Sequence, residues 1–332
     1  MKDDKATVNP ISIQPRVPLV FASDESYAMP LATALRSIAE AKRTIDPFEV
    51  YILYNTFQER ARRRVTDSLP AGSFSIHWVL VDLTHCQAYS TSRYISKITY
   101  ARLAIPELLP RSVTKALYLD SDILVFGDLT ALQESELSGA AIGAVLDRLD
   151  AKLKAGETLW TKDIPSVRNY FNAGVLLIDL TRWREDRISE RAFEYLRKHP
   201  RTPLSDQDAL NVVCDRVWKQ LEPRWNFIND YEMQLSGMPA REEPTIIHFA
   251  GPLKPWQIGI RDPNTRIYDL IRSRTCFARN KRDKARDFLK APLRFFESGL
   301  WWQTKRVLRR YEAFRRIRLY IMQTRGVNTR SL

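Results

Sequence analysis

One segment near the middle of the chain, Lys115–Asp122, constrains both the fold and the chemistry. Its sequence, KALYLDSD, is an apolar run that ends in Asp120 and Asp122, two carboxylates separated by one residue. Side chains at positions i and i+2 of a strand point to the same face, so these carboxylates can converge just beyond the strand end. Such oxygen ligands suit Mg²⁺ or Mn²⁺ carrying a phosphorylated ligand. The alternative is a solvated turn, because Asp and Ser are common turn residues.

The rest of the chain alternates between strand-like and helix-like segments. Apolar runs predict buried strands at 17–22, 48–54, 74–81, 141–146, 173–178 and 245–249. Helices are expected at 30–41, 57–68, 98–104, 180–198 and 206–217. Pro106 and Pro110 are expected to close the third helix, and Ser205 to cap the fifth. This alternation predicts an α/β fold with a mostly parallel sheet, where ligands bind beyond the carboxyl ends of the strands.

Composition excludes several other classes of protein. Cys86, Cys214 and Cys276 are far apart and the four histidines are scattered, so neither a disulfide framework nor a multi-histidine metal centre is expected. The chain has no apolar run of roughly 18 residues, no signal-peptide core, and neither the G-x-G-x-x-G nor the P-loop motif. We therefore expect a cytoplasmic protein without a membrane span, a dinucleotide fingerprint or a P-loop.

Positive charge is concentrated at the end of the chain. Residues 279–332 hold 16 of the 52 Lys and Arg but 4 of the 39 Asp and Glu, so residues 1–278 are nearly neutral. Apolar residues recur there at helical spacing, at Val307, Tyr311, Phe314, Ile317 and Ile321. A basic amphipathic helix of this kind is typical of binding to an anionic membrane surface. One alternative is that this helix packs on the rest of the protein. The other is nucleic-acid binding, but the remainder of the chain gives no support for it.

The expected organisation has three parts. A polar leader covers 1–16, a single catalytic domain covers 17–278, and a basic amphipathic tail covers 279–332. We expect this tail to hold the protein peripherally on the cytoplasmic face of the inner membrane.

Three further motifs carry polar groups. In the segment 247–256, His248 can complete the site of Asp120 and Asp122, and Lys254 can neutralise phosphate oxygens as a point charge. A lone histidine at a strand end is otherwise structural. The other two motifs are Tyr170-Phe-Asn-Ala-Gly before a buried strand and Ser205-Asp-Gln-Asp at a helix N-terminus.

Together these motifs resemble glycosyltransferase family 8, and most closely its bacterial lipopolysaccharide α-galactosyl- and α-glucosyltransferases. The matching segments are 20–27, 99–103, 118–122, 171–175, 206–208 and 248–256. The resemblance implies a GT-A fold, a Rossmann-like nucleotide-binding domain with a mostly parallel mixed sheet. It also implies retaining hexosyl transfer (EC 2.4.1) of galactose or glucose from a UDP-sugar. The acceptor would be a glycan hydroxyl in lipopolysaccharide core or a related surface polysaccharide.

The resemblance also implies roles for individual residues. Asp120, Asp122 and His248 would hold Mn²⁺, for which Mg²⁺ can substitute. Asp24 would contact the uracil base beside Tyr27. The full predicted donor-binding set is Asp24, Tyr27, Arg102, Asp120, Ser121, Asp122, Asn172, Ala173, Asp206, Gln207, Gly251 and Lys254. Two positions depart from the family pattern, because Ser26 replaces a nucleotide-side asparagine and Tyr94 an acceptor-side histidine.

The catalytic candidates are Gln207 and its neighbours Asp206 and Asp208. A two-step displacement would need a carboxylate on the β-face of the sugar, where the resemblance places the amide of Gln207. We therefore favour a front-face mechanism, in which the departing phosphate oxygen helps to deprotonate the incoming hydroxyl and Gln207 stabilises the oxocarbenium-like centre.

Two rival functions use the same residues. One is a nucleotide-sugar pyrophosphorylase or hydrolase; the absence of a Gly-rich, Arg/Lys-containing phosphate loop near the N-terminus counts against the pyrophosphorylase. A non-catalytic, nucleotide-binding membrane scaffold would be expected to have lost a residue of the metal set.

Overall fold

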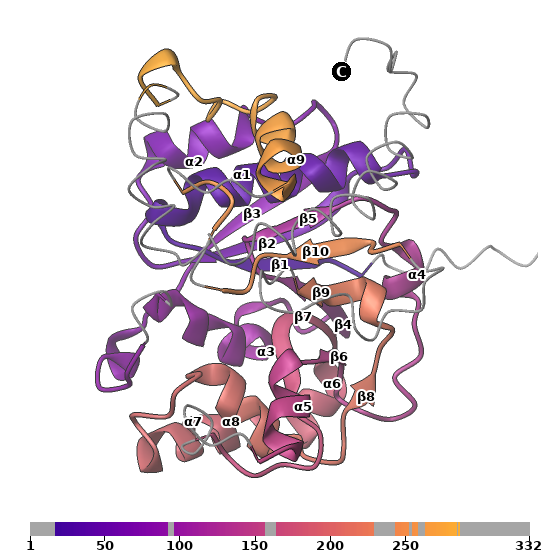
Figure 1. The fold of residues 1–332 in the computed structure, drawn as a ribbon. Helices are drawn as coiled ribbons and strands as arrows, with labels where there is room; N and C mark the ends of the chain where they lie inside the picture. The colour runs from indigo at the N-terminus through magenta and orange to yellow at the C-terminus, as the bar shows by residue number, and fades with distance from the viewer. Residues whose placement is uncertain are drawn as a thin grey trace, which may run out of the picture.

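The structure, a computed structural model, describes residues 17–91, 96–156, 164–228, 243–251, 254–257, 263–283 and 285. Within them the chain forms an α/β fold whose central sheet is covered by helices on both faces (Figure 1). The predicted leader, Tyr94 and the tail beyond residue 285 lie outside the described residues. In the part of the chain that is described, no helix has the length and apolar character needed to cross a bilayer.

Among the described residues, the central sheet has seven strands in the order β3-β2-β1-β4-β7-β6-β8. The first four of these in space run parallel to one another, and β7 is antiparallel to both β4 and β6. The predicted mixed, mostly parallel sheet is therefore confirmed. The strand bounds are β1 Leu19–Ala22, β2 Phe48–Tyr54, β3 Phe74–Leu80, β4 Lys115–Leu119, β6 Ile142–Leu146, β7 Phe171–Asp179 and β8 Lys219–Gln220.

The central strands read as continuous apolar runs because both of their faces are buried. In β1, Leu19 and Phe21 pack into a core on one face of the sheet, and Val20 packs into a second core on the other face. The first core includes Leu31 and Leu35, and the second includes Trp183. The sheet is thus held between two apolar layers, and its polar residues gather at the strand ends.

A smaller sheet places the segment 246–248 beside the Asp120–Asp122 turn. Its order is β5-β10-β9, with bounds β5 Ile123–Val125, β10 Ile246–His248 and β9 Phe227–Ile228. Strands β5 and β10 are antiparallel, and His248 pairs with Ile123. Because Ile123 directly follows Asp122, this register brings His248 alongside the two aspartates.

The helices form two layers, as Figure 1 shows. On one side of the sheet lie α1 (Ala28–Ala41), α2 (Glu59–Thr66) and α9 (Pro263–Arg272). On the other side lie α3, α5, α6, α7 and α8. Their bounds are α3 Ile105–Leu108, α5 Arg148–Lys154, α6 Leu180–Glu185, α7 Ile188–Lys198 and α8 Asp206–Val213. The shorter elements are α4 Thr130–Gln133 and the 3₁₀ segments η1 Glu25–Tyr27, η2 Thr84–Cys86, η3 Lys97–Ala104 and η4 Pro223–Asn226.

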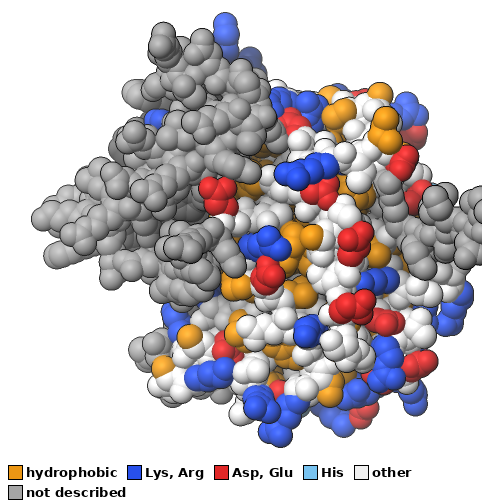
Figure 2. Space-filling model, turned by 90° about the vertical axis from the view of Figure 1, so that its right-hand side faces the viewer, with side chains coloured by type: hydrophobic (Ala, Val, Ile, Leu, Met, Phe, Trp, Pro, Cys, Tyr) orange, Lys and Arg blue, Asp and Glu red, His pale blue; other side chains and the backbone are white. Residues whose placement is uncertain are grey.

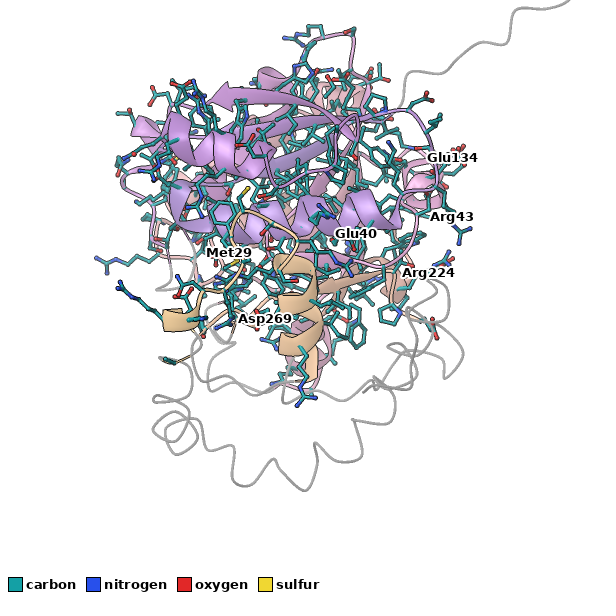
Figure 3. The ribbon with its side chains drawn as sticks, turned by 90° about the horizontal axis from the view of Figure 1, so that it is seen from above. Met29, Glu40, Arg43, Glu134, Arg224 and Asp269 are labelled. Carbon is teal, nitrogen blue, oxygen red and sulfur yellow. The ribbon has the colours of Figure 1, made fainter. Side chains whose placement is uncertain are left out.

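Helix α9 packs against α1 and the smaller sheet. Seen from above in Figure 3, α9 lies beside α1. The Tyr268 hydroxyl lies 3.5 Å from the sulfur of Met29, and Arg274 pairs with Glu40 at 2.5 Å. On the face shown in Figure 2, acidic and basic side chains are interspersed, as expected from the near-neutral composition of residues 1–278.

Two helix predictions were wrong in their bounds. The helix expected at 180–198 is two helices, α6 and α7, separated by Arg187 in the left-handed conformation with a φ of 51°. The break lets both Trp183 and Ile188 enter the same core, where the Trp183 indole N–H donates to Ser189 at 2.9 Å. The helix expected at 206–217 ends at Val213, before Arg216, whose φ is 66°.

The segment around Pro106 also differs from the prediction. Residues 97–104 form the 3₁₀ segment η3, and the chain continues into α3 instead of stopping at Pro106. Proline is tolerated there because the first turn of a helix needs no N–H from that position. Ser205 occupies the N-cap position of α8 but makes no capping bond, because its hydroxyl donates to the carbonyl of Ser90.

Candidate active site

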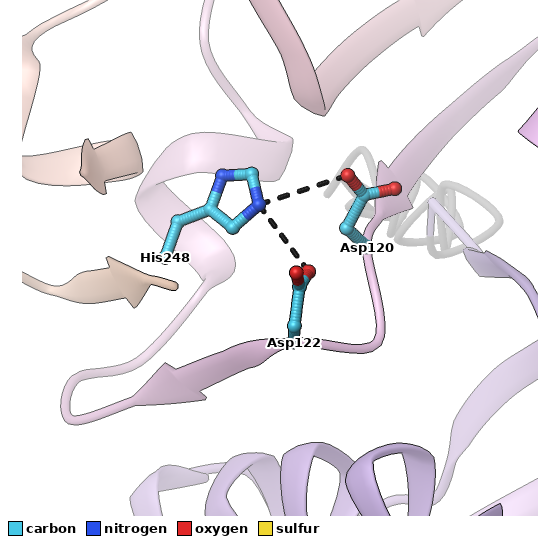
Figure 4. A group of neighbouring side chains, drawn as sticks. All are labelled: Asp120, Asp122 and His248. Carbon is cyan, nitrogen blue, oxygen red and sulfur yellow. Dashed lines mark ion pairs between the residues drawn. The ribbon is translucent and has the colours of Figure 1, made fainter. Parts of the chain in front are cut away.

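Asp120, Asp122 and His248 face one another at the junction of the two sheets (Figure 4). Their ligand atoms all lie within 4.8 Å of one another. His248 Nε2 is 3.7 Å from Asp120 Oδ2 and 3.3 Å from Asp122 Oδ1. Two carboxylates and an imidazole form a donor set that suits a divalent transition metal such as Mn²⁺. The structure thus brings together the three residues predicted to hold the metal.

Strand β7 lies against Asp120 and His248 at Gly174. The amide of Asp120 donates to the carbonyl of Gly174 at 2.8 Å. A Cβ at position 174 would lie 2.2 Å from His248 Cε1 and 2.8 Å from Asp120 Oδ2. Real Cβ atoms do not approach that closely, so the site exists in this form only because residue 174 has no side chain.

Lys254 neutralises one of the two aspartates. Its ammonium donates to Asp122 Oδ2 at 2.5 Å and to the Phe249 carbonyl at 2.6 Å, which uses two of its three N–H donors. Burial opposes ionisation of Asp122, but the Lys254 ammonium is the strongest of the interactions that hold the pKa of this carboxyl well below its usual range. Asp122 is therefore a carboxylate, as metal binding requires.

Arg102 connects Asp120 to helix α8. Its guanidinium contacts Asp120 Oδ1 at 2.9 Å, Asp206 Oδ2 at 2.8 Å and the Ala173 carbonyl at 2.5 Å. It also lies over the Tyr118 ring, whose hydroxyl donates to Asp120 at 2.7 Å. Burial disfavours the charged guanidinium, yet Asp120 and Asp206 raise the pKa of Arg102 above its ordinary value. Arg102, predicted beside the donor sugar, thus bridges Asp120 and Asp206.

The two carboxylates that flank Gln207 are buried and engaged. Asp206 pairs with Arg102 and also accepts a hydrogen bond from the Thr99 hydroxyl at 2.7 Å. Burial raises the pKa of the Asp206 carboxyl to about 6, although Arg102 and Thr99 act in the opposite direction. Asp208 accepts from the Tyr170 hydroxyl, from Thr202 at 2.6 Å and from the Leu204 amide at 2.8 Å. Burial also raises the pKa of Asp208, although the Thr202 and Tyr170 bonds lower it.

Gln207 is the half-buried member of this triplet. Its Oε1 accepts the Ala173 amide at 2.9 Å, and its Nε2 donates to Asp147 at 3.2 Å. Asn172, also predicted at the donor sugar, donates to the same Asp147 oxygen at 2.8 Å. The predicted residues Asn172, Ala173 and Gln207 therefore share one hydrogen-bonded unit across β7 and α8.

The residues predicted around the nucleotide lie at the end of β1. Asp24 caps η1 and accepts from the Ser26 amide at 2.9 Å and the Ser96 hydroxyl at 2.5 Å. Tyr27 packs edge-on against Trp256 at 5.8 Å. Burial and the nearby Asp122, Asp120 and Asp24 carboxylates raise the pKa of Tyr27 well above its usual range.

Two further predicted residues, Ser121 and Gly251, are close in sequence to Asp120, Asp122 and His248. Ser121 is buried, and its hydroxyl has no hydrogen-bond partner among the described residues. Gly251 follows β10, and a Cβ there would meet no described atom within 4 Å.

Sequence reasoning missed Asp147 and Asn226. Asp147 directly follows β6, so its place at a strand end was a usable signal. Asn226 lies in η4 between Trp225 and Phe227, and its Oδ1 is 2.9 Å from His248 Nδ1. No local pattern marks Asn226, because its role depends on the packing of η4 against β10.

Comparison with known proteins assigns the class. The sequence model of glycosyl transferase family 8 matches residues 18–258, so the chain belongs to this family of glycosyltransferases. This assignment favours neither the pyrophosphorylase nor the scaffold alternative. Family 8 enzymes typically use a divalent metal, and the Asp120, Asp122 and His248 group is the candidate site.

Individual relatives are distant. General stress protein A of Bacillus subtilis is 28% identical over 262 residues, covering 74% of this chain and 89% of that protein. Lipopolysaccharide 1,2-glucosyltransferase of Escherichia coli is 24% identical over 260 residues, covering 76% of each. The crystal structure of the galactosyltransferase LgtC with donor and acceptor sugar analogs superposes with a TM-score of 0.69 at 26% identity. It covers 81% of this chain and 100% of that one. The GT-A-like fold is therefore confirmed.

The crowding at Gly174 generates a prediction. Gly174→Ala should weaken Mn²⁺ binding at least about tenfold, because its methyl group displaces both His248 and Asp120. Gly143→Ala is the matched control, since its Cβ would meet Leu137 at 2.7 Å in the core of the same sheet, away from the metal group. Both variants should lose about 1–3 kcal/mol of unfolding free energy, but only Gly174→Ala should lose Mn²⁺ affinity in an electron paramagnetic resonance titration. Equal affinities in the two variants would contradict this account.

Proposed function

We propose that this glycosyltransferase transfers a hexose, galactose or glucose, from a UDP-sugar to a hydroxyl of a glycan acceptor with retention of configuration. The observation that carries the proposal is the convergence of Asp120, Asp122 and His248 next to the unit that holds Gln207. The similarity to a lipopolysaccharide 1,2-glucosyltransferase and to LgtC supports a hexose donor and an acceptor in lipopolysaccharide core or a related surface polysaccharide.

The proposed donor site is built around a divalent cation. Asp120, Asp122 and His248 would hold Mn²⁺, with Mg²⁺ as a substitute, and the cation would supply positive charge for the diphosphate leaving group. Lys254 adds a fixed positive charge, because its third N–H donor can reach a phosphate oxygen while the other two hold the protein. The remaining proposed donor contacts are those of Asp24, Tyr27, Arg102, Ser121, Asn172, Ala173, Asp206, Gln207 and Gly251.

The proposed mechanism is a front-face displacement. Asp206 and Asp208 are 2% and 0% exposed, and both carboxylates are occupied by protein donors, so neither is placed to attack an anomeric carbon. Gln207 remains exposed enough to meet the sugar, and its bonds to Ala173 and Asp147 fix its orientation. In this mechanism the departing phosphate oxygen takes the proton of the incoming hydroxyl, and Gln207 stabilises the oxocarbenium-like centre.

A donor screen tests the proposed function. The protein should release UDP from UDP-galactose or UDP-glucose only when Mn²⁺ or Mg²⁺ is present, and faster when extracted lipopolysaccharide is added. Asp122→Asn should abolish release, whereas Asp82→Asn, in an exposed turn away from the cluster, should not. Metal-independent release, or no release from any UDP-sugar, would refute the function. A glycosyl adduct on Asp206 or Asp208 in mass spectra of the same reactions would refute the mechanism.

The domain organisation and the membrane association remain proposals from the sequence. We propose that residues 17–278 form the catalytic domain and that the basic tail, 279–332, holds it at the cytoplasmic face of the inner membrane. A protein truncated after residue 278 should no longer sediment with liposomes containing anionic lipid, yet should still release UDP. Unchanged sedimentation would show that residues 279–332 are not needed for membrane association.

A further inference from the structure

A buried chain of hydrogen bonds reaches His248 from the side opposite the aspartates. Asn172 Oδ1 accepts the Gly174 amide at 2.9 Å and Asn226 Nδ2 at 2.9 Å. Asn226 Oδ1 then lies 2.9 Å from His248 Nδ1. Asn172, Asn226 and His248 are 6%, 2% and 2% exposed, so a mismatched pair of donors or acceptors would be costly.

The direction of every bond in this chain follows from one group. The backbone N–H of Gly174 can only donate, so the Asn172 atom that faces it must be the oxygen. The Asn226 atom that faces this oxygen must then be its amide nitrogen, which leaves the Asn226 oxygen facing His248. An oxygen can only accept, so His248 Nδ1 must carry the proton.

Asp147, at the other end of the Asn172 amide, requires the same orientation of that amide. Its Oδ2 accepts from Asn172 Nδ2 at 2.8 Å and from Gln207 Nε2 at 3.2 Å, and its Oδ1 accepts the Leu149 amide at 2.9 Å. Reversing the Asn172 amide would therefore place two oxygens together at Asp147 and two donors together at Gly174. The chain has a single satisfied arrangement.

From this arrangement we infer that Asn226 is a positioning residue that holds His248 as the Nδ1–H tautomer, which leaves Nε2, the ring nitrogen nearest Asp120 and Asp122, free to bind a metal. A neutral imidazole binds a metal through its unprotonated nitrogen, and the partner of the other nitrogen decides which one that is. Gly174 and Asp147 determine which way the Asn172 amide is oriented, and Asn226 bonds both Asn172 and the His248 ring.

The direct test reads the tautomer without a donor or a metal. The chain has four histidines, so ¹H–¹⁵N correlation spectra of selectively labelled protein give few signals, and His248→Gln identifies the ring concerned. At a pH where the ring carries one proton, that proton should be on Nδ1. A proton on Nε2, with Nδ1 bare, would overturn the inference.

A variant series tests the consequence for metal binding. Asn226→Leu should weaken Mn²⁺ binding by about 10- to 100-fold, the usual cost of losing the partner of a ligating histidine. Asn226→Asp keeps an acceptor for the Nδ1 proton and should recover most of that loss. Asn211→Leu is the control, because Asn211 is equally buried and its bonds among the described residues go to Phe171 and the Gln207 carbonyl, not to His248. It should lower stability and leave Mn²⁺ affinity unchanged.

Two results in this series would count against the inference, namely unchanged Mn²⁺ affinity in Asn226→Leu or an equal loss in Asn211→Leu. The inference rests on the proposed function only in taking the Asp120, Asp122 and His248 group as the metal site. Absence of UDP release together with an Nδ1–H tautomer would therefore refute the function alone. If Asn226→Leu does not fold, the tautomer of the unchanged protein still decides the question.

Discussion

The site depends on the close approach of strand β7 to the turn between β4 and β5, which requires a glycine at position 174. The carbonyl of Gly174 accepts the Asp120 amide, and its N–H begins the hydrogen-bond chain that ends at His248. The space where its side chain would lie is taken by the His248 ring and the Asp120 carboxylate. Gly174 therefore has three roles. It holds β7 against Asp120, it leaves room for the His248 ring, and its N–H sets the direction of the hydrogen bonds that reach His248.

Around this point, charge is balanced by buried pairs. Arg102 joins Asp120 to Asp206, and Lys254 pairs with Asp122, so each aspartate of the cluster has a protein cation beside it. Asp206 and Asp208 hold the first turn of α8 in place, and Gln207 is left to face outward from it. Breaking such a pair would leave an uncompensated buried charge, which is strongly destabilising.

Much of the fold follows from local pattern, because a strand buried on both faces must be a continuous apolar run, as β1, β4 and β7 are. The convergence of Asp120 and Asp122 was also predicted, although both lie in the turn beyond Leu119 and not within the strand. Local pattern does not report packing, so the helix break at Arg187 and the 3₁₀ turns of η3 were missed. For the same reason the contact of Asn226 with His248 was not predicted.

The central claim is that Asp120, Asp122 and His248 bind one divalent cation through carboxylate oxygens and His248 Nε2. The most direct measurement is the anomalous scattering of crystals grown with Mn²⁺, recorded on both sides of the manganese absorption edge. The account predicts one strong peak within coordination distance of both carboxylates and Nε2. A peak that contacts Nδ1, or no peak between these three residues, would contradict it.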